Sequence, residues 1–359
     1  MSDKKEGAPF AKNILSLQVD LSKFSPASEE DKQSFEVMRP SSTFWRDGFK
    51  NFKKNKMAMT SVIVLALIII AILVVPLFVP YKYSETIKVN GQRDRSVANL
   101  HPYKWSEKEQ EFIDNGGKLF PHVMGTDQLG RDYLIRVIIG TRISLLVGFF
   151  ASLIVLVIGL VYGSISGFLG GKVDLVMMRI VDIIYSLPDT LLIILLSFVL
   201  KETIGTQIQG TILAKLGTGM ISMFIVFGLL YWVSMARLIR GQILSIKENE
   251  YVLAATAMGA SNGRMIRKHI LPNCISVIII STALQIPSAI FTESFLSFLG
   301  LGVAVPMPSL GSLASDARQG LQTYPYKLIF PAIIISLIVL TLNLIGDGLR
   351  DAFDPKLRK

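Results

Sequence analysis

The sequence contains only one cysteine, Cys274, among 359 residues. A single thiol forms neither an intrachain disulfide nor a thiolate metal cluster, which excludes a fold stapled by either. Charged residues are scarce as well, at 18% of the chain against about a quarter in soluble domains. Together with 51% hydrophobic residues and a mean hydropathy of +0.49, this scarcity indicates a protein that lies in a lipid bilayer.

Sequence motifs of catalysis are missing too. No glycine-rich phosphate loop ends in Gly-Lys-Ser or Gly-Lys-Thr, and no zinc-binding His-Glu motif occurs. The three histidines, His101, His122 and His269, are scattered along the chain. We therefore predict that the protein is not an enzyme and has no catalytic residue, no cofactor and no metal site.

Long apolar runs, in contrast, are abundant. Each is close to the roughly 20 residues that an α-helix needs to cross a bilayer, and none alternates as the strands of a membrane barrel do. The six runs are Met59–Val79, Ile143–Leu169, Ile183–Leu200, Leu216–Ala236, Cys274–Thr292 and Leu328–Ile345. They predict an all-α membrane protein with six transmembrane helices, in which Pro188 and Pro287 should kink their helices.

Lysine and arginine gather beside particular spans, within Arg46–Lys56, Arg237–Lys268 and Arg350–Lys359. Because basic residues flanking membrane helices favour the cytoplasm, we expect all three clusters and both termini to lie inside. The net charge of +10 is explained by this bias, and no nucleic-acid partner is expected. The basic stretch that opens at Phe44-Trp45 is typical of the interface with membrane lipid, although a solvated charged helix has a similar pattern.

The spans and charges divide the chain into five parts. A polar cytoplasmic tail comes first, an extracytoplasmic insertion follows the first span, and a cytoplasmic tail closes the chain. The parts are 1–43 (polar tail), 44–80 (basic interfacial segment and first span), 81–133 (insertion), 134–347 (five-helix core with the cytoplasmic loop 237–273) and 348–359 (C-terminal tail).

The cytoplasmic loop 237–273 has the most informative pattern. Its sequence Glu250-Tyr251-Val252-Leu253-Ala254-Ala255-Thr256-Ala257-Met258-Gly259 predicts a short helix, because alanine favours helices and glycine closes them in a left-handed conformation. Tyr251 and Val252 would present an apolar plug, and small side chains would allow a partner close to the backbone. After a turn, a second helix is expected to stop before Pro272.

The loop's alanine pair, glycine and downstream Ile-Leu-Pro resemble the coupling motif of the permeases of binding-protein-dependent ABC importers. In that family the first loop helix docks into a groove on a cytoplasmic ATPase and transmits its closure. The resemblance implies this role for Glu250, Tyr251, Val252, Ala254, Ala255, Ala257 and Gly259. Leu253 departs from the pattern, since many members have a glutamate before the alanine pair.

Four further blocks resemble the C-type subunits of dipeptide and oligopeptide permeases. They are Gly125–Asp132, Asp174–Pro188, Glu293–Gly300 and Gly346–Pro355, and the likeness runs from about Phe44 to Arg358. It implies type I ABC importer architecture in a prokaryotic plasma membrane and a channel-forming role in peptide import by alternating access. The implied partners are a second homologous permease subunit, two cytoplasmic ABC ATPase subunits and an extracytoplasmic peptide-binding lipoprotein.

Two alternatives stay open at this point. The same machinery imports nickel, glutathione or other small solutes in related permeases, and the sequence does not distinguish these cargoes. An ion-coupled secondary carrier belongs to another class and would normally carry charges or paired broken helices near the middle of the bilayer. The spans here are nearly uncharged, which disfavours a carrier.

A few polar residues lie close to the apolar runs. Arg179 and Asp182, three apart on one helix face, are expected to pair at the cytoplasmic boundary, with a transport role as the alternative. Glu293, at the predicted outer end of the fifth span, is expected to line the passage or contact the partner subunit, or else to be a hydrated boundary residue. The glycine repeat Gly163-Gly167-Gly171 predicts close helix packing.

Overall fold

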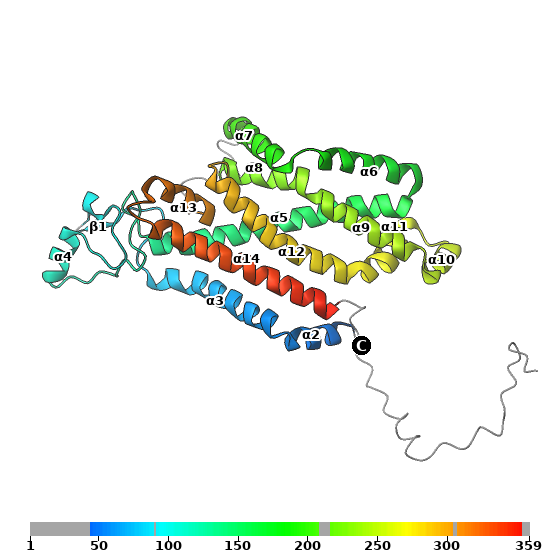
Figure 1. The fold of residues 1–359 in the computed structure, drawn as a ribbon, viewed down its shortest axis with the longest axis horizontal. Coiled ribbons are helices and arrows are strands. Elements are labelled where there is room, and N and C mark those ends of the chain that lie inside the picture. The colour runs from blue at the N-terminus through cyan, green and yellow to red at the C-terminus, as the bar shows by residue number, and fades with distance from the viewer. Residues whose placement is uncertain (1–43, 90, 208–215, 304–306, 354–359) are drawn as a thin grey trace, which may run out of the picture. The chain divides into compact units, whose positions relative to one another are not determined.

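A computed structural model describes residues 44–89, 91–207, 216–303 and 307–353. The chain divides into two compact units, Met1–Arg46 and Asp47–Lys359, and the arrangement below is that of the second unit. The predicted N-terminal tail, residues 1–43, and the last six residues, 354–359, lie outside the described residues. The described chain is mainly helical, as Figure 1 shows.

Within the described residues, five helices are long and apolar enough to cross a membrane. Two are uninterrupted α-helices in the first half of the chain, α3 (Lys56–Phe78) and α5 (Tyr133–Leu169), and α14 (Tyr326–Phe353) is the last. The other two contain a π-helical turn. They are Thr218–Lys247, made of α8 (Thr218–Val226), η4 (Phe227–Tyr231) and α9 (Trp232–Lys247), and Asn262–Phe298, made of α11 (Asn262–Met265), η5 (Ile266–Ile270) and α12 (Leu271–Phe298).

The third predicted span differs from a single straight helix. It consists of α6 (Gly171–Ser186) and α7 (Asp189–Gln207), which are bent by 90° at the break between them, and counting this bent pair as one span gives six. Pro188 explains the break, because it has no amide hydrogen to donate and disfavours helical geometry at Leu187. The residues from 171 to 182, which lie between the second and third predicted spans, form most of α6.

Close packing of α5 against α9 organises the bundle. A Cβ added at Gly159, Gly163 or Gly167 would lie 2.6, 2.5 or 3.0 Å from the nearest atom of α9. Glycine is therefore required for the two backbones to approach each other. The glycines in this contact are Gly159, Gly163 and Gly167. The predicted repeat began one turn later and ended at Gly171, which has a φ of +55° and whose added Cβ would have no atom within 4 Å.

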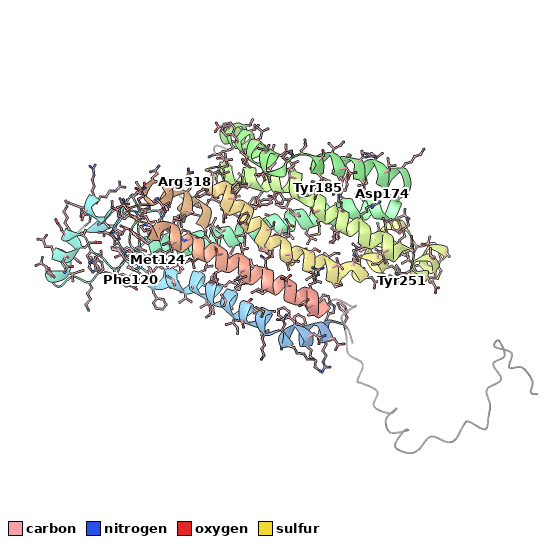
Figure 2. The ribbon with its side chains drawn as sticks, in the orientation of Figure 1. Phe120, Met124, Asp174, Tyr185, Tyr251 and Arg318 are labelled. Carbon is pink, nitrogen blue, oxygen red and sulfur yellow. The ribbon has the colours of Figure 1, made fainter. Side chains whose placement is uncertain are left out.

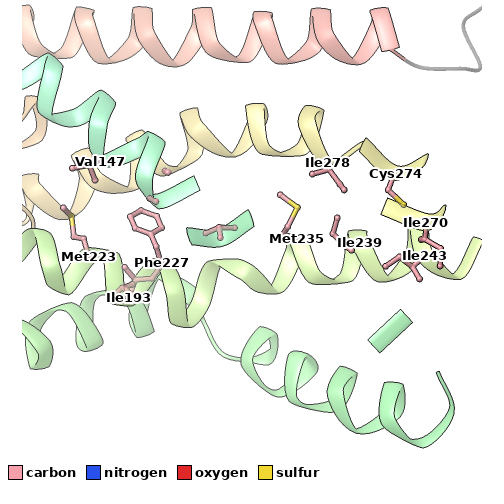
Figure 3. Close-up of a cluster of buried hydrophobic side chains, with 14 of the residues drawn as sticks. Val147, Ile193, Met223, Phe227, Met235, Ile239, Ile243, Ile270, Cys274 and Ile278 are labelled. Atoms are coloured by element: carbon pink, nitrogen blue, oxygen red, sulfur yellow. The ribbon is translucent and has the colours of Figure 1, made fainter. Parts of the chain in front are cut away.

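A large apolar cluster lies between these helices (Figure 3). Phe227, Ile239, Ile243, Ile270 and Cys274 are each fully buried in it. Burial, not a disulfide, therefore accounts for the single cysteine. On α3, by contrast, many large apolar side chains, such as Leu67, Leu73 and Leu77, are exposed, as expected of a helix with one side toward lipid.

The two ends of the bundle carry different elements (Figure 1). At one end lie the predicted insertion and the segment after α12. Their elements are β1 (Lys88–Val89), β2 (Gln92–Arg93), η2 (Arg95–Val97), α4 (Glu107–Asp114), α13 (Leu310–Ala317) and η6 (Arg318–Gly320). β1 and β2 pair as an antiparallel hairpin. At the other end lies α10 (Glu250–Ala257).

The basic stretch before α3 forms the helix α2 (Phe44–Lys54). Within the second unit, Gly48 and Phe52 are buried, and a Cβ at Gly48 would lie 2.2 Å from the ring of Phe353. Phe353 is the last residue of α14, so the helix continues beyond the predicted start of the C-terminal tail at 348. The first six residues of the predicted tail, 348–353, are therefore part of α14.

Candidate functional site

The helix α10 forms as its sequence predicts. Glu250 places a negative charge in the first turn, where the helix dipole favours it. At the other end Gly259 adopts a φ of +79°, and its amide donates to Thr256 O at 2.9 Å while the amide of Ala260 donates to Ala255 O at 3.2 Å. These two bonds form a Schellman motif, which ends the helix and turns the chain.

The seven residues predicted to couple to an ATPase do not share one face of α10. Val252 and Ala255 are only 2% and 5% exposed, and both belong to the large apolar cluster. They are therefore covered by this chain and unavailable to a partner. Five exposed residues of α10 and its cap form what we call the α10 face: Tyr251, Leu253, Ala254, Ala257 and Met258. Glu250, Thr256 and Gly259 are exposed as well.

The α10 face is mostly apolar. Leu253 is 58% exposed and Met258 is 82% exposed, and Tyr251 lies at the end of the molecule opposite Phe120 and Met124 (Figure 2). Leu253, which replaces the glutamate of the family pattern, thus extends an apolar surface where a charge was expected. Exposed apolar residues gathered on one helix are typical of a protein-docking surface.

The buried side of α10 is continuous with the membrane helices. Val252 belongs to the same cluster as Met265 and Ile270, which precede α12, and as Ile243 of α9. Figure 3 shows Ile243, Ile270 and Cys274 gathered where these segments meet. In addition, Asn273 Nδ2 donates to Tyr251 Oη at 3.1 Å and to His269 O at 2.6 Å. α10 is therefore packed against α9 and the segment before α12, and it is hydrogen-bonded to α12.

The second loop helix was predicted to stop before Pro272, but it does not. It continues through η5 into α12, where Pro272 occupies one of the first two positions. A proline is tolerated there because the amides of a first helical turn need no partner within that turn. The π-helical turn supplies the change of register that lets the helix continue.

Glu293 is completely buried on α12. Its carboxylate accepts hydrogen bonds from Ser144 Oγ and Ser297 Oγ, both at 2.7 Å, and from Ser294 Oγ at 3.3 Å. Ser144 Oγ also accepts from the amide of Leu310 at 3.2 Å, so Glu293 connects α12 with α5 and α13. In this structure the side chain therefore reaches neither a passage nor the surface, and the corresponding prediction is corrected to a structural role.

Asp182 pairs with a residue other than the predicted Arg179. Arg237 of α9 donates to Asp182 Oδ1 at 2.8 Å, and its guanidinium lies 4.3 Å from the centre of the Tyr185 ring. A second pair that the sequence analysis missed joins the same helices, because Arg240 donates two hydrogen bonds to Asp174. Both acids contact bases of a different helix, which no local spacing rule could reveal.

The insertion contains a buried charged cluster that was also missed. His122 donates from Nδ1 to Asp132 and from Nε2 to Glu109, both at 3.0 Å, and all three side chains are at most 1% exposed. Burial lowers the pKa of His122, but the bonds to Asp132 and Glu109 outweigh burial and raise the pKa to about 9. Asp132 also caps α5 by accepting from the amide of Ile135.

A second charged cluster covers the start of α5. Asp127 accepts from Arg131 Nε at 2.6 Å and lies 3.4 Å from Nε of Arg136, whose terminal nitrogen lies 3.7 Å from Asp316. Burial raises the pKa of Asp316, and the arginines oppose that increase. Asp127 also accepts from the amides of Leu129 and Arg131, which makes this block a structural turn.

The fold defines a class: a multi-pass membrane protein with a short exposed helix, α10, at one end of its bundle. Residues 159–359 match the family of the binding-protein-dependent transport system inner membrane component, and residues 43–102 match the N-terminal membrane domain of oligopeptide transport permease C. The chain belongs to the binding-protein-dependent transport system inner membrane component family, whose members are multi-pass proteins of the bacterial inner membrane.

Several characterised relatives are similar over most of their length. The oligopeptide transport system permease protein OppC of Bacillus subtilis is 40% identical over 94% of this chain and 97% of its own. The dipeptide transport system permease protein DppC of the same organism is 39% identical over 92% of both chains. The OppC protein of Escherichia coli is 38% identical over 88% of this chain and 92% of its own.

Proposed function

We propose that this chain is one of two channel-forming subunits of an ATP-driven importer of dipeptides or oligopeptides. The relatives' names support a peptide cargo, because both an oligopeptide and a dipeptide permease protein match almost the whole chain. The sequence has no phosphate-binding loop, so ATP hydrolysis is assigned to separate cytoplasmic ATPase subunits. The permease itself is proposed to be non-catalytic.

The observation that carries the proposal is the division of α10 into two sides. Its exposed side is apolar, at Leu253 and Met258, while Val252 and Ala255 are buried in the cluster that reaches α9 and α12. A partner that grips the exposed side would therefore move two membrane helices. Alternating access requires such a connection between the ATPase and the membrane helices, because closure of the ATPase must favour one of two states of the bundle.

The placement of charges supports an orientation with α10 in the cytoplasm. The basic helix α2 and the residues Arg264, Arg267 and Lys268 near α10 follow the bias of cytoplasmic segments. The insertion 81–133 lies at the opposite end of the bundle and is proposed to be extracytoplasmic. It would face a peptide-binding lipoprotein, and a second homologous permease subunit would complete the channel.

The proposal is tested by placing arginine on the α10 face. L253R and A254R put a bulky charge on the surface proposed to enter the ATPase groove, whereas S261R adds the same charge to an exposed residue beyond the Schellman motif. We expect the first two variants to reach the membrane but to lose at least about tenfold in ATPase co-purification and peptide uptake. S261R should retain both. Normal binding and uptake in L253R and A254R would refute the docking surface.

A further inference from the structure

The helix α2 leads into the membrane helix α3 with only Asn55 between them. Asn55 caps α3, because its side-chain oxygen accepts a hydrogen bond from the amide of Ala58 at 3.1 Å. α3 has 23 residues, which span about 35 Å at about 1.5 Å per residue, and the hydrocarbon core of a bilayer is about 30 Å thick. The start of α3 at Lys56 therefore lies at a membrane surface, and α2 lies at the level of the lipid headgroups.

One side of α2 is packed against the ends of two membrane helices. Gly48 and Phe52 are buried on this side. A Cβ added at Gly48 would lie 2.2 Å from the ring of Phe353, and one added at Gly348 would lie 2.4 Å from Cβ of Ala58 and 3.2 Å from the ring of Phe52. Each glycine thus faces an aromatic ring across the contact, which fixes α2 relative to α3 and α14 (Figure 1).

The opposite side of α2 is basic. Lys50, Lys53 and Lys54 are spaced by three and four residues, which places them on one helix face, away from the packed side. All three are exposed, and so is Lys56 at the start of α3. Within the described residues, none of these four side chains takes part in an ion pair or a hydrogen bond. We call the four residues the α2 lysine cluster.

Apolar side chains are exposed among these lysines. Phe49 is 56% exposed and precedes Lys50, and Met57 is 67% exposed and follows Lys56. Exposed apolar groups beside lysines are typical of helices that lie in the membrane interface, where the apolar groups enter the boundary between headgroups and acyl chains. The combination therefore favours a lipid surface over a small soluble anion.

Acids near the α2 lysine cluster are fewer than the lysines. Asp47 is the one acid in the sequence of α2, and at the end of α14 the exposed Asp347 and Asp351 accompany Arg350. Positive charge is therefore in excess at this end of α3 and α14. Basic clusters immediately beside a membrane helix attract anionic headgroups.

We propose that the α2 lysine cluster binds the phosphate groups of anionic phospholipids. The cluster lies at headgroup level because α2 joins α3 there, and Phe49 and Met57 enter the boundary with the acyl chains. Since the other side of α2 is packed on α14, bound lipid also holds the end of that helix. The inference concerns a lipid partner, goes beyond the proposed function and does not depend on it.

The test measures which lipid the protein retains. The full-length chain is purified from detergent micelles that contain equal amounts of phosphatidylglycerol and phosphatidylcholine. The ratio of retained phosphatidylglycerol to phosphatidylcholine should be at least about threefold higher for the wild type than for K50Q/K53Q/K54Q, which removes three cations from the headgroup level. Glutamine favours a helix about as well as lysine, so α2 should still form. K50R/K53R/K54R keeps the charges and should keep the wild-type ratio.

The matched control removes the same charge elsewhere. K88Q/K104Q/K118Q changes three exposed lysines of the insertion, at the opposite end of the bundle, and should keep the wild-type ratio. If the glutamine variant of the α2 lysine cluster also keeps that ratio, the headgroup site is refuted. Inorganic phosphate that lowers the wild-type ratio more than chloride of equal ionic strength would indicate a site for a soluble anion and would also overturn the inference.

A second measurement compares unfolding temperatures in nanodiscs. In phosphatidylcholine alone, K50Q/K53Q/K54Q should unfold at the wild-type temperature, because its three lysines have no partner among the described residues. Phosphatidylglycerol at about a quarter of the lipid should raise the unfolding temperature of the wild type by at least about 3 °C more than that of the variant, because a ligand of the folded state stabilises it. Equal increases would overturn the inference. So would a variant that loses only its association with ATPase subunits, since the cluster would then be a protein contact.

Discussion

The guanidinium of Arg240 on α9 donates two hydrogen bonds to the carboxylate of Asp174 on α6, at 2.8 and 2.5 Å. Ser166 of α5 donates to the same carboxylate at 2.5 Å. Apolar residues of α6 such as Val176 and Ile180 remain exposed, so this polar junction attaches α6 to the bundle together with the buried side chain of Val181. Asp174 lies in a block that resembles peptide permeases, although no local pattern indicated its partner.

The first prediction concerns this junction. R240K keeps the charge but loses the planar fork that makes two parallel bonds, so it should destabilise the folded chain. We expect a loss of about 1–2 kcal/mol, because the Arg240 side chain is 34% exposed and water weakens the pair. The readout is the temperature at which the buried thiol of Cys274 becomes reactive in detergent.

R237K is the matched control for R240K. Its partner Asp182 is 53% exposed and Arg237 is 36% exposed, so the pair should contribute less than about 0.5 kcal/mol. Equal losses in the two variants would contradict the special role of the Asp174 junction.

The apolar spans could be predicted from sequence, but their ends could not. α5 begins at Tyr133, well before the predicted start at Ile143, and it includes Arg136. Arg136 is 2% exposed and lies near Asp127 and Asp316, which compensate its charge. An apolarity pattern does not extend the span back past Arg142 and Arg136, because the acids that make the burial of Arg136 tolerable come from elsewhere in the fold.

In the candidate site, the helix could be predicted from the sequence, but its buried side could not. The helix α10 follows from its alanines and from Gly259, which are local signals. The side of α10 that is buried depends on α9 and on the segment before α12, so Val252 was assigned to the wrong side. In the same way, Asp182 was paired with a neighbour three residues away, although its partner Arg237 lies 55 residues later.

The second prediction concerns Glu293. E293A removes the acceptor of two buried serine hydroxyls, those of Ser144 and Ser297, and should destabilise the chain by about 2–4 kcal/mol. E293Q keeps one acceptor oxygen and the same shape, so it should lose about 1 kcal/mol or less. Thermal unfolding in detergent measures both, and an E293A variant as stable as the wild type would argue against the structural role.

The third prediction concerns the contact of α5 with α9. A Cβ at Gly163 would lie 2.5 Å from the carbonyl oxygen of Ala236, so G163A should force the helices apart at a cost of about 1–3 kcal/mol. G241A is the control on α9, because no atom lies within 4 Å of its added Cβ. It should be neutral or stabilise the helix by up to about 1 kcal/mol. The order of the two unfolding temperatures checks the prediction.

The fourth prediction concerns pH. The pKa of His122 is raised to about 9 in the folded insertion from an ordinary value of 6.5. A raised pKa means that the stabilisation is complete below pH 6.5 and is lost as the pH rises through 9. Unfolding measured between pH 5 and 10 should show this decline in the wild type, and H122Q should remove it. A wild-type chain that becomes more stable between pH 6.5 and 9 would contradict the buried imidazolium.

The last prediction concerns the side of the membrane on which α10 lies. Met258 is 82% exposed at the end of α10, and Glu107 is exposed on α4 at the opposite end of the bundle. In a C274A background, an impermeant maleimide added to intact cells should label E107C and leave M258C unlabelled. Permeabilised cells should show labelling of both, which proves that the M258C thiol is accessible. The reverse pattern would place α10 outside the cell, where no nucleotide-hydrolysing subunit could hold it, and would remove the connection to the ATPase from the proposed mechanism.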